Sequence, residues 1–221
     1  MKIMAINGSP RKKKWNTVTL LESALEGASS AGAETEIIHL YDLQFSGCLS
    51  CFSCKRLDRK ENGVCAVRDA LTPVLERIRK ADALIIGTPV YCGAETASTR
   101  AFLERLLYSN LNYGKNFKAL ASHFPRRINT AMIYTMNATD EMITYFGFDR
   151  LFATMKMFME VIFGTCELLL SKDTLQFNNY DEYEVALFDK VKKAKRHAEV
   201  FPEECKHAFE LGIRMARGDI S

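Results

Sequence analysis

Four of the chain's seven cysteines lie within one short stretch, and their spacing suits metal or redox chemistry. Cys48, Cys51 and Cys54 form a C-x2-C-x2-C run, and Cys65 follows after ten intervening residues. Thiolates at this spacing are found in iron–sulfur ligation. Four thiolates can also hold tetrahedral zinc, and free thiols that join only on oxidation are a third interpretation. The residues alone leave these three alternatives open.

A second group of polar residues lies in the segment NGSPRKKKWNT, from Asn7 to Thr17. Directly before a helical pattern, Ser9, Arg11, Asn16 and Thr17 offer hydroxyl and amide donors and a cation. Such a set at a helix N-terminus can bind an anion. The plain alternative is a basic surface turn in which Asn16 or Thr17 caps the helix. Neither a P-loop nor the dinucleotide pattern G-x-G-x-x-G is present.

The elements that must position these residues alternate along the chain. Apolar runs that end in turn residues predict strands at 2–6, 35–40, 83–87, 129–138 and 166–171. Apolar residues at helical spacing predict helices at 18–28, 71–78, 100–108 and 142–163, and from 181 onward with a break near Pro202. This alternation predicts an α/β domain over residues 1–221 with a mostly parallel, doubly wound sheet, a cysteine-rich excursion at 47–65 and a helical C-terminal region. Ligands of such sheets bind at the carboxyl ends of the strands, so the loops after the first, third and fourth strands should form the site.

Two segments in the expected order carry a resemblance to a known family. GSPR after the first strand, with NT opening the helix, resembles the phosphate loop of flavodoxin-like NAD(P)H-dependent FMN oxidoreductases. GTPVYCG, from Gly87 to Gly93, is similar to that family's G-[ST]-P-x-Y motif, and STRAFLERL resembles its following helix. The resemblance extends over most of the chain up to the fourth strand. It implies a flavodoxin-like three-layer sandwich with a five-stranded parallel sheet in the order 2-1-3-4-5.

The same resemblance implies that FMN binds across these loops. Ser9, Arg11, Asn16 and Thr17 would bind its phosphate. A planar heteroaromatic ring needs backbone donors and a flat face, which the loops after the third and fourth strands would provide. The candidates are Thr88, Pro89, Val90, Tyr91, Cys92, Gly93, Thr135, Met136 and Asn137.

The cysteine segment resembles that of the iron–sulfur flavoproteins, a branch of the same family. In that branch a compact four-cysteine motif after the second strand holds a 4Fe–4S cluster near the FMN. The resemblance implies that Cys48, Cys51, Cys54 and Cys65 are cluster ligands, with a longer interval before Cys65 than in the compact motif.

Composition excludes several classes of partner. The chain has 221 residues, 48% of them hydrophobic, and a net charge of +3 at pH 7, which is ordinary for a globular protein and does not indicate nucleic acid. The first residues lack the apolar length of a signal peptide, and no apolar run approaches the about 20 residues of a membrane span. A cytoplasmic protein without a membrane partner is therefore expected. Apolar residues cover more than one stripe of the Met- and Phe-rich segment 142–163, so it is either buried on several sides or forms a subunit interface or a lid over the flavin. We favour a subunit interface with part of the segment lining the substrate pocket, and the family resemblance implies a homodimer or homotetramer.

Together these features predict an FMN-dependent oxidoreductase that takes reducing equivalents from NAD(P)H. The acceptor would be a quinone, a flavin or another small molecule, or a redox protein. The flavin would supply the chemistry and the protein its orientation, so no general base is expected. The alternative is an iron–sulfur flavoprotein that exchanges electrons with ferredoxin-like partners. A low-molecular-weight phosphatase is excluded, because no cysteine stands six residues before an arginine.

Overall fold

Five parallel strands form the centre of the molecule in a computed structural model, which describes residues 1–59, 61–114 and 120–219. They are β1 (Lys2–Asn7), β2 (Glu34–His39), β3 (Ala83–Tyr91), β7 (Ile128–Thr135) and β8 (Gly164–Ser171). Their spatial order is β2-β1-β3-β7-β8, and each neighbouring pair is parallel. This order confirms the predicted flavodoxin-like α/β sheet.

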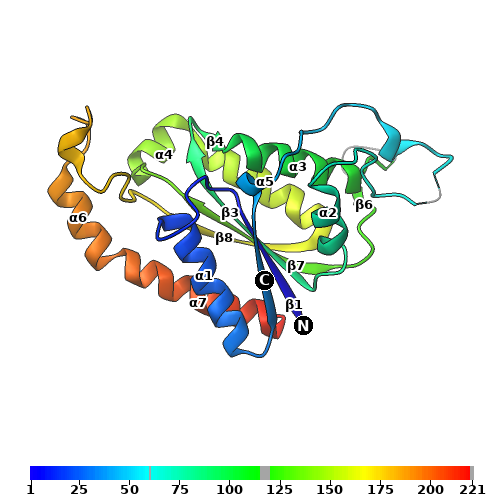
Figure 1. The fold of residues 1–221 in the computed structure, drawn as a ribbon, viewed down its shortest axis with the longest axis horizontal. Helices are drawn as coiled ribbons and strands as arrows, with labels where there is room; N and C mark the ends of the chain where they lie inside the picture. The colour runs from blue at the N-terminus through cyan, green and yellow to red at the C-terminus, as the bar shows by residue number, and fades with distance from the viewer. Residues whose placement is uncertain (60, 115–119, 220–221) are drawn as a thin grey trace.

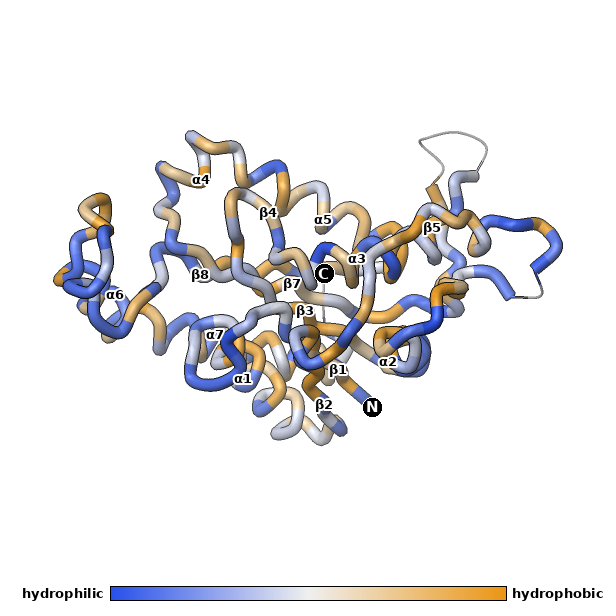
Figure 2. Tube along the Cα trace, turned by 45° about the horizontal axis from the view of Figure 1, so that its top comes forward, coloured by the Kyte–Doolittle hydropathy of each residue, from blue (hydrophilic) through white to orange (hydrophobic). Residues whose placement is uncertain are grey.

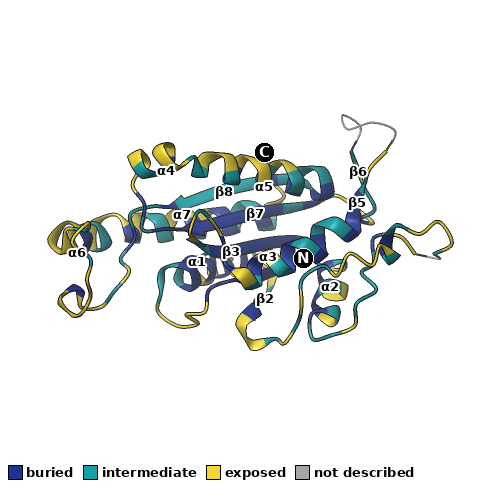
Figure 3. Cartoon of the chain, turned by 90° about the horizontal axis from the view of Figure 1, so that it is seen from above, coloured by how far each residue is buried: buried dark blue, intermediate teal, exposed yellow. Residues whose placement is uncertain are grey.

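Helices cover both faces of the sheet (Figure 1). One face packs against α1 (Asn16–Ser30) and α7 (Phe201–Arg217), and the other packs against α2 (Thr72–Ile78), α3 (Ala97–Asn110) and α5 (Phe148–Phe163). Alternate residues of β1 pack into the two helical layers, because successive side chains of a strand point to opposite faces of the sheet. Ile3 belongs to the α1–α7 side and Met4 to the other. Figure 3 shows β3 and β7 buried between these layers.

The third strand is longer than the sequence indicates. It continues through Pro89 to Tyr91 and folds back into the short antiparallel strand β4 (Ala94–Glu95). Cys92 and Gly93 make the connecting turn with φ values of 50° and 77°. Two-residue hairpin turns favour positive φ at both central residues, because that backbone matches the twist of the flanking strands. The expected Thr-Pro turn is therefore a hairpin that reaches beyond the sheet.

Two predicted helices differ from the structure. The expected helix 142–163 is divided into α4 (Asp140–Phe146) and α5 by Gly147, whose φ of 71° ends the first helix. The C-terminal region begins with a 3-10 turn at Tyr180–Glu182, and helix α6 (Lys190–Glu199) starts only where Asp189 caps two backbone N–H groups. The predicted break near Pro202 is confirmed, because α7 begins at Phe201.

The cysteine-rich excursion leaves the sheet after β2 and contains only one short 3-10 turn, Ser53–Lys55, in its described part. A further 3-10 turn (Leu40–Asp42) precedes it, and the small strands β5 (Leu111–Asn112) and β6 (Ala121–Ser122) lie near it. Long hydrophilic stretches mark the excursion and α6 in Figure 2. Polar contacts hold the excursion to α3: Lys55 Nζ donates to the carbonyl oxygens of Tyr108 and Leu111, at the C-terminal end of the helix.

Candidate functional site

A cavity of about 120 Å³ opens at the carboxyl edge of the sheet, where the sequence places the site. The loops after β1, β7 and β8 and the end of β3 all contribute to it. Its lining includes Ser9, Arg11, Trp15, Asn16, Thr17, Pro89, Val90, Tyr91, Thr135, Met136, Asn137, Thr174, Leu175 and Gln176. Ten of the thirteen cofactor residues that the sequence indicates are thus gathered in one place, and Thr88, Cys92 and Gly93 are not.

The loop after β1 is braced from within. The side chain of Asn7 accepts from the N–H of Ser9 at 3.0 Å, and the hydroxyl of Ser9 accepts from the N–H of Arg11 at 3.2 Å. Gly8 donates to the carbonyl of Gly87 at 2.8 Å, and a Cβ at Gly8 would overlap the hydroxyl of Thr99. The glycine is therefore needed for the first loop to lie against β3.

The N-terminus of α1 faces this cavity without a side-chain cap. The N-cap residue is Trp15 rather than Asn16 or Thr17, and it makes no capping hydrogen bond. Asn16 instead donates to the carbonyl of Leu175 at 2.9 Å, and the hydroxyl of Thr17 bonds that of Thr135 at 2.6 Å. The first N–H groups of a helix lack intrahelical partners and carry its positive dipole end, so they suit an anion.

Arg11 adds a positive charge to the same wall. Its guanidinium lies 3.8 Å from the centre of the Trp15 ring, and Nη1 donates to the carbonyl of Gln176 at 2.9 Å. Burial raises the pKa of the neighbouring Tyr91, an effect that the charge of Arg11 opposes. The hydrogen bond from Arg11 to Gln176 joins the loops after β1 and β8 across the cavity.

The GTPVYCG motif, which spans the end of β3 and the hairpin turn, divides into three parts. Pro89, Val90 and Tyr91 line the cavity. Thr88 is fully buried beneath it, where its hydroxyl accepts from that of Thr99 at 3.1 Å. Cys92 and Gly93 lie at the tip of the hairpin and line a separate hollow beside residues 146–148.

The loop after β8 completes the cavity, and sequence analysis missed it. Thr174, Leu175 and Gln176 come from this loop, and the side chain of Asn137 donates to that of Gln176 at 2.7 Å. Their composition gives no local signal. Their place after a strand, at the edge where ligands bind, is the only feature that could have indicated them. Trp15 was likewise missed, because a lone aromatic residue in a basic loop has no specific pattern.

Lys193 of α6 reaches the same wall from the C-terminal region. It is almost fully buried, and its ammonium bonds the side chains of Asn137 and Asp173. Burial lowers the pKa of this lysine, while the carboxylate of Asp173 opposes that effect. The loop after β7 is thus held in place by α6, which follows much later in the sequence.

The donor set of the cavity fits the phosphate end of FMN. The uncapped N-terminus of α1, the guanidinium of Arg11 and the hydroxyl groups of Ser9 and Thr17 converge there. The oxygens of a phosphate can accept hydrogen bonds from all of these groups. The volume is that of a small group rather than a whole nucleotide, because Arg11 and Gln176 close the space between their loops.

The four clustered cysteines do not form a metal cage in the structure. Cys51 is exposed, Cys54 is buried, and Cys48 and Cys65 are half-buried, all as free thiols. Cys48 lines a groove against α3 and α5, whereas Cys65 lines a different cavity. Across residues 1–59, 61–114 and 120–219, no group of three or more His, Cys, Asp or Glu side chains could hold a metal ion. The arrangement therefore does not fit a bound cluster.

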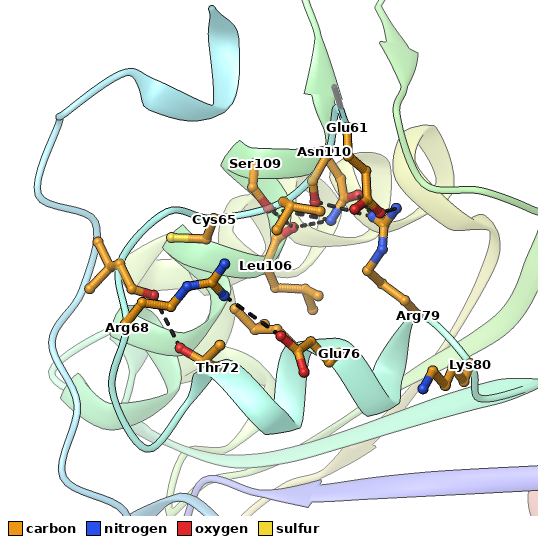
Figure 4. Close-up of a pocket in the computed structure, with 14 residues that line it drawn as sticks. Glu61, Cys65, Arg68, Thr72, Glu76, Arg79, Lys80, Leu106, Ser109 and Asn110 are labelled. Atoms are coloured by element: carbon orange, nitrogen blue, oxygen red, sulfur yellow. Dashed lines mark hydrogen bonds and ion pairs between the residues drawn. The ribbon is translucent and has the colours of Figure 1, made fainter. Parts of the chain in front are cut away.

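The cavity beside Cys65 lies between the excursion and helices α2 and α3 (Figure 4), with a volume of about 320 Å³. Four of its charged side chains form two pairs: Arg79 contacts Glu61 at 3.1 Å, and Arg68 contacts Glu76 at 3.6 Å. Arg79 also donates to the carbonyl of Gly63 at 3.2 Å. The contacts of Arg79 hold the excursion against the C-terminal end of α2.

Comparison with known proteins adds three findings. Residues 1–125 match the family model for NADPH-dependent FMN reductase. An iron-sulfur flavoprotein from Archaeoglobus fulgidus is 41% identical over 105 residues, 48% of each chain. One from Methanocaldococcus jannaschii is 36% identical over 105 residues, which is 48% of this chain and 51% of the relative. The chain thus matches about half the length of these curated relatives.

Solved structures share the fold at low sequence identity. An NAD(P)H:quinone oxidoreductase from Methanothermobacter marburgensis superposes with a TM-score of 0.67 at 16% identity, over 96% of this chain and 98% of that one. An FMN-dependent NADH-azoreductase from Bacillus anthracis, solved in complex with FMN, gives a TM-score of 0.65 at 14% identity, over 98% and 100% of the two chains. At these identities the similarity establishes the fold alone.

Proposed function

Because the chain belongs to the NADPH-dependent FMN reductase family, we propose that it is an FMN-dependent oxidoreductase. It takes reducing equivalents from NAD(P)H and passes them to a quinone, a flavin or another small acceptor. The observation that carries this proposal is the cavity at the carboxyl edge, where Arg11 and the uncapped N-terminus of α1 converge with the loops after β3, β7 and β8.

Each side of the cavity has its own part in this proposal. Ser9, Arg11, Asn16 and Thr17 hold the phosphate, because they surround the positive end of α1. The ring lies against the loops after β3 and β7. Its contacts are Pro89, Val90, Tyr91, Thr135 and Asn137, with Cys92 and Gly93 at the hairpin tip, while Thr88 supports the strand from beneath. When bound, FMN supplies the hydride and electron chemistry, and the chain binds and orients it.

The test is direct titration of the purified protein with FMN, followed by anaerobic addition of NADPH or NADH. We expect quenching of FMN fluorescence at a stoichiometry of one, then loss of the flavin absorbance with at least one nicotinamide. A protein that fails to bind FMN would exclude the proposal. A protein that binds FMN but is reduced by neither nicotinamide would be a flavin carrier rather than a reductase.

The second candidate function is electron transfer by an iron–sulfur flavoprotein with ferredoxin-like partners. The names of the curated relatives favour it, and so does the presence of Cys48, Cys51, Cys54 and Cys65. The placement of these thiols does not favour it. Iron analysis of anaerobically purified protein decides between the two: about four iron atoms per chain would support the carrier, and none would exclude the cluster.

We also propose that the chain forms a homodimer or homotetramer through the α4–α5 region. Tyr145 and Phe146 of α4 are 83% and 58% exposed, and Met157 of α5 is 44% exposed. Large apolar side chains exposed together are characteristic of interaction surfaces. Sedimentation velocity measures this assembly. The cytoplasmic location stays a prediction; none of the described helices is both long enough and apolar enough to cross a membrane.

A further inference from the structure

A carboxylate is buried beneath the β3–β4 hairpin, beside the candidate flavin site. Glu95 of β4 lies directly opposite Val90 of β3 in an antiparallel pair. The side chains of such a pair lie on the same face of the sheet, about 4.5–5.5 Å apart at their Cβ atoms. Val90 lines the cavity, so the side chain of Glu95 lies immediately behind its wall.

The surroundings of this carboxylate are unusual. The Glu95 side chain is fully buried, and its Oε1 accepts from the hydroxyl of Tyr134 at 2.9 Å. Its Oε2 has no hydrogen-bond partner among the described residues. Among the described residues, the nearest cation is the half-exposed guanidinium of Arg100, whose Nη1 lies 3.8 Å from Oε2. The negative charge of Glu95 is therefore only partly compensated.

Tyr134 holds this carboxylate as a neutral donor. It is fully buried in β7, and its ring packs 4.7 Å from that of Phe152. Burial raises the pKa of its hydroxyl, and the charge of Glu95 adds to this effect, so the hydroxyl keeps its proton. Tyr134 directly precedes Thr135, which lines the cavity. The hydrogen bond thus joins the hairpin to the strand that carries the third loop.

A buried carboxylate with an unpaired oxygen is costly, and an apolar residue would pack β4 without that cost. We propose that Glu95 positions the hairpin on β7 and lowers the midpoint potential of FMN bound in the adjacent site. This inference rests on the function proposed above. Reduction adds electron density to the flavin, so a fixed negative charge nearby disfavours the reduced form.

The test is Glu95→Gln, which keeps the shape and the oxygen that accepts from Tyr134 but removes the charge. We expect the affinity for reduced FMN, relative to oxidised FMN, to rise about tenfold. For a two-electron couple this is a shift of the midpoint potential by about +30 mV. Arg100→Gln should shift the potential in the negative direction, and by less, because this side chain is half exposed.

Tyr134→Phe separates charge from position. It loosens the hairpin but leaves the charge of Glu95 in place, so we expect no positive shift. A purely structural role would leave Glu95→Gln like wild type, because its amide oxygen still accepts from Tyr134, while Tyr134→Phe alone would change the protein, and that result would overturn the inference. An unchanged potential in Glu95→Gln would also overturn it and would leave the proposed function intact.

Two other outcomes are also decisive. If the wild-type chain does not bind FMN, the proposed function fails and the inference fails with it. If Glu95→Gln does not fold, as judged by circular dichroism and thermal unfolding, Glu95→Met takes its place, because it also removes the charge and an apolar side chain suits the buried position. A positive shift in Glu95→Met supports the inference, and an unchanged or negative shift overturns it.

Discussion

Arg11 is the side chain on which the candidate phosphate site depends most directly. Its guanidinium is already oriented, stacked on Trp15 and bonded to the carbonyl of Gln176. A cation held in this way loses little freedom when it binds an anion. The neighbouring lysines of the loop do not line the cavity.

Replacing Arg11 with alanine should therefore weaken FMN binding by about 10- to 100-fold. A hydrogen bond to a charged group contributes about 1.5–3 kcal/mol, which is the source of this range. Fluorescence titration measures the dissociation constant. Lys13→Ala is the matched control, since it removes the same charge from the same loop outside the cavity. Equal losses in both variants would show that only the general charge of the loop matters.

Residue types alone indicated the loops after β1 and β7 and the end of β3, but neither the loop after β8 nor how each side chain points. The pattern GTPVYCG placed six neighbours in one ring site, yet Thr88 faces Thr96, the N-cap of α3, and Thr99 within α3. Cys92 and Gly93 point elsewhere because a two-residue hairpin turn carries them past the cavity. Such orientations follow from strand length and turn type, which a short motif does not encode.

At the scale of elements, a buried arginine of α3 stabilises the segments on either side of the cysteine-rich excursion. Arg105 of α3 is fully buried, and it donates to the carboxylate of Asp69 and to the carbonyl oxygens of Ser46 and Val67, at 3.2 and 3.0 Å. Burial would raise the pKa of Asp69. The hydrogen bond from Arg105 and those from backbone N–H groups outweigh that effect and lower the pKa.

Asp69→Asn should destabilise the chain by about 3–5 kcal/mol at pH 7, because it leaves the charge of Arg105 buried without a partner. The folded-state pKa of Asp69 lies below the ordinary value of about 3.9, so its contribution is complete above that pH. It is lost as the pH falls through the lower folded-state value. Urea unfolding at pH 7 and at about pH 3 measures this contribution. The difference in the free energy of unfolding between wild type and Asp69→Asn should be smaller at the lower pH.

Asp58→Asn is the control for this prediction. Asp58 also pairs with an arginine of the excursion, but both side chains are largely exposed. We expect no measurable loss of stability, because exposed pairs are screened by solvent. A loss equal to that of Asp69→Asn would show that burial of Arg105 is not the cause.

The elements that sequence predicted best are the five parallel strands, all of which are present in the predicted order. The central strands β1, β3 and β7 are largely buried, as expected of a sheet covered on both faces, while the edge strands β2 and β8 are partly exposed. The elements it missed depend on single residues or on distant partners. Gly147 ends α4 within an apolar pattern, β4 has only two residues, and the loop after β8 becomes part of the site only through the fold.

At the scale of the whole molecule, the site depends on a helix outside the region that matches the family. The family model matches residues 1–125, whereas α7 spans Phe201–Arg217. Figure 1 shows α7 beside α1, whose N-terminus forms the candidate phosphate site. Leu211 and Met215 of α7 are fully buried in the core layer that α1 shares with the sheet. The C-terminal segment thus completes the layer that fixes α1.

Two glycines allow this close packing. A Cβ at Gly212 of α7 would overlap the carbonyl oxygen of Ala24, and a Cβ at Gly27 of α1 would overlap that of Phe209. Both obstacles are backbone atoms, which move only if the helices separate. Gly212→Ala should therefore destabilise the chain by about 1–3 kcal/mol, despite the higher helix propensity of alanine.

For a chain of this length, each kcal/mol lowers the melting temperature by about 2–4 °C, which differential scanning calorimetry resolves. Ser29→Ala, an exposed change on α1, should stay within about 0.5 kcal/mol of wild type. If α7 fixes α1 at the site, Gly212→Ala should also weaken FMN binding although it touches no residue of the cavity. If Gly212→Ala shows the predicted loss of about 1–3 kcal/mol but an unchanged FMN affinity, the phosphate site is held by its own loops instead, through Thr17, Thr135 and Asn16.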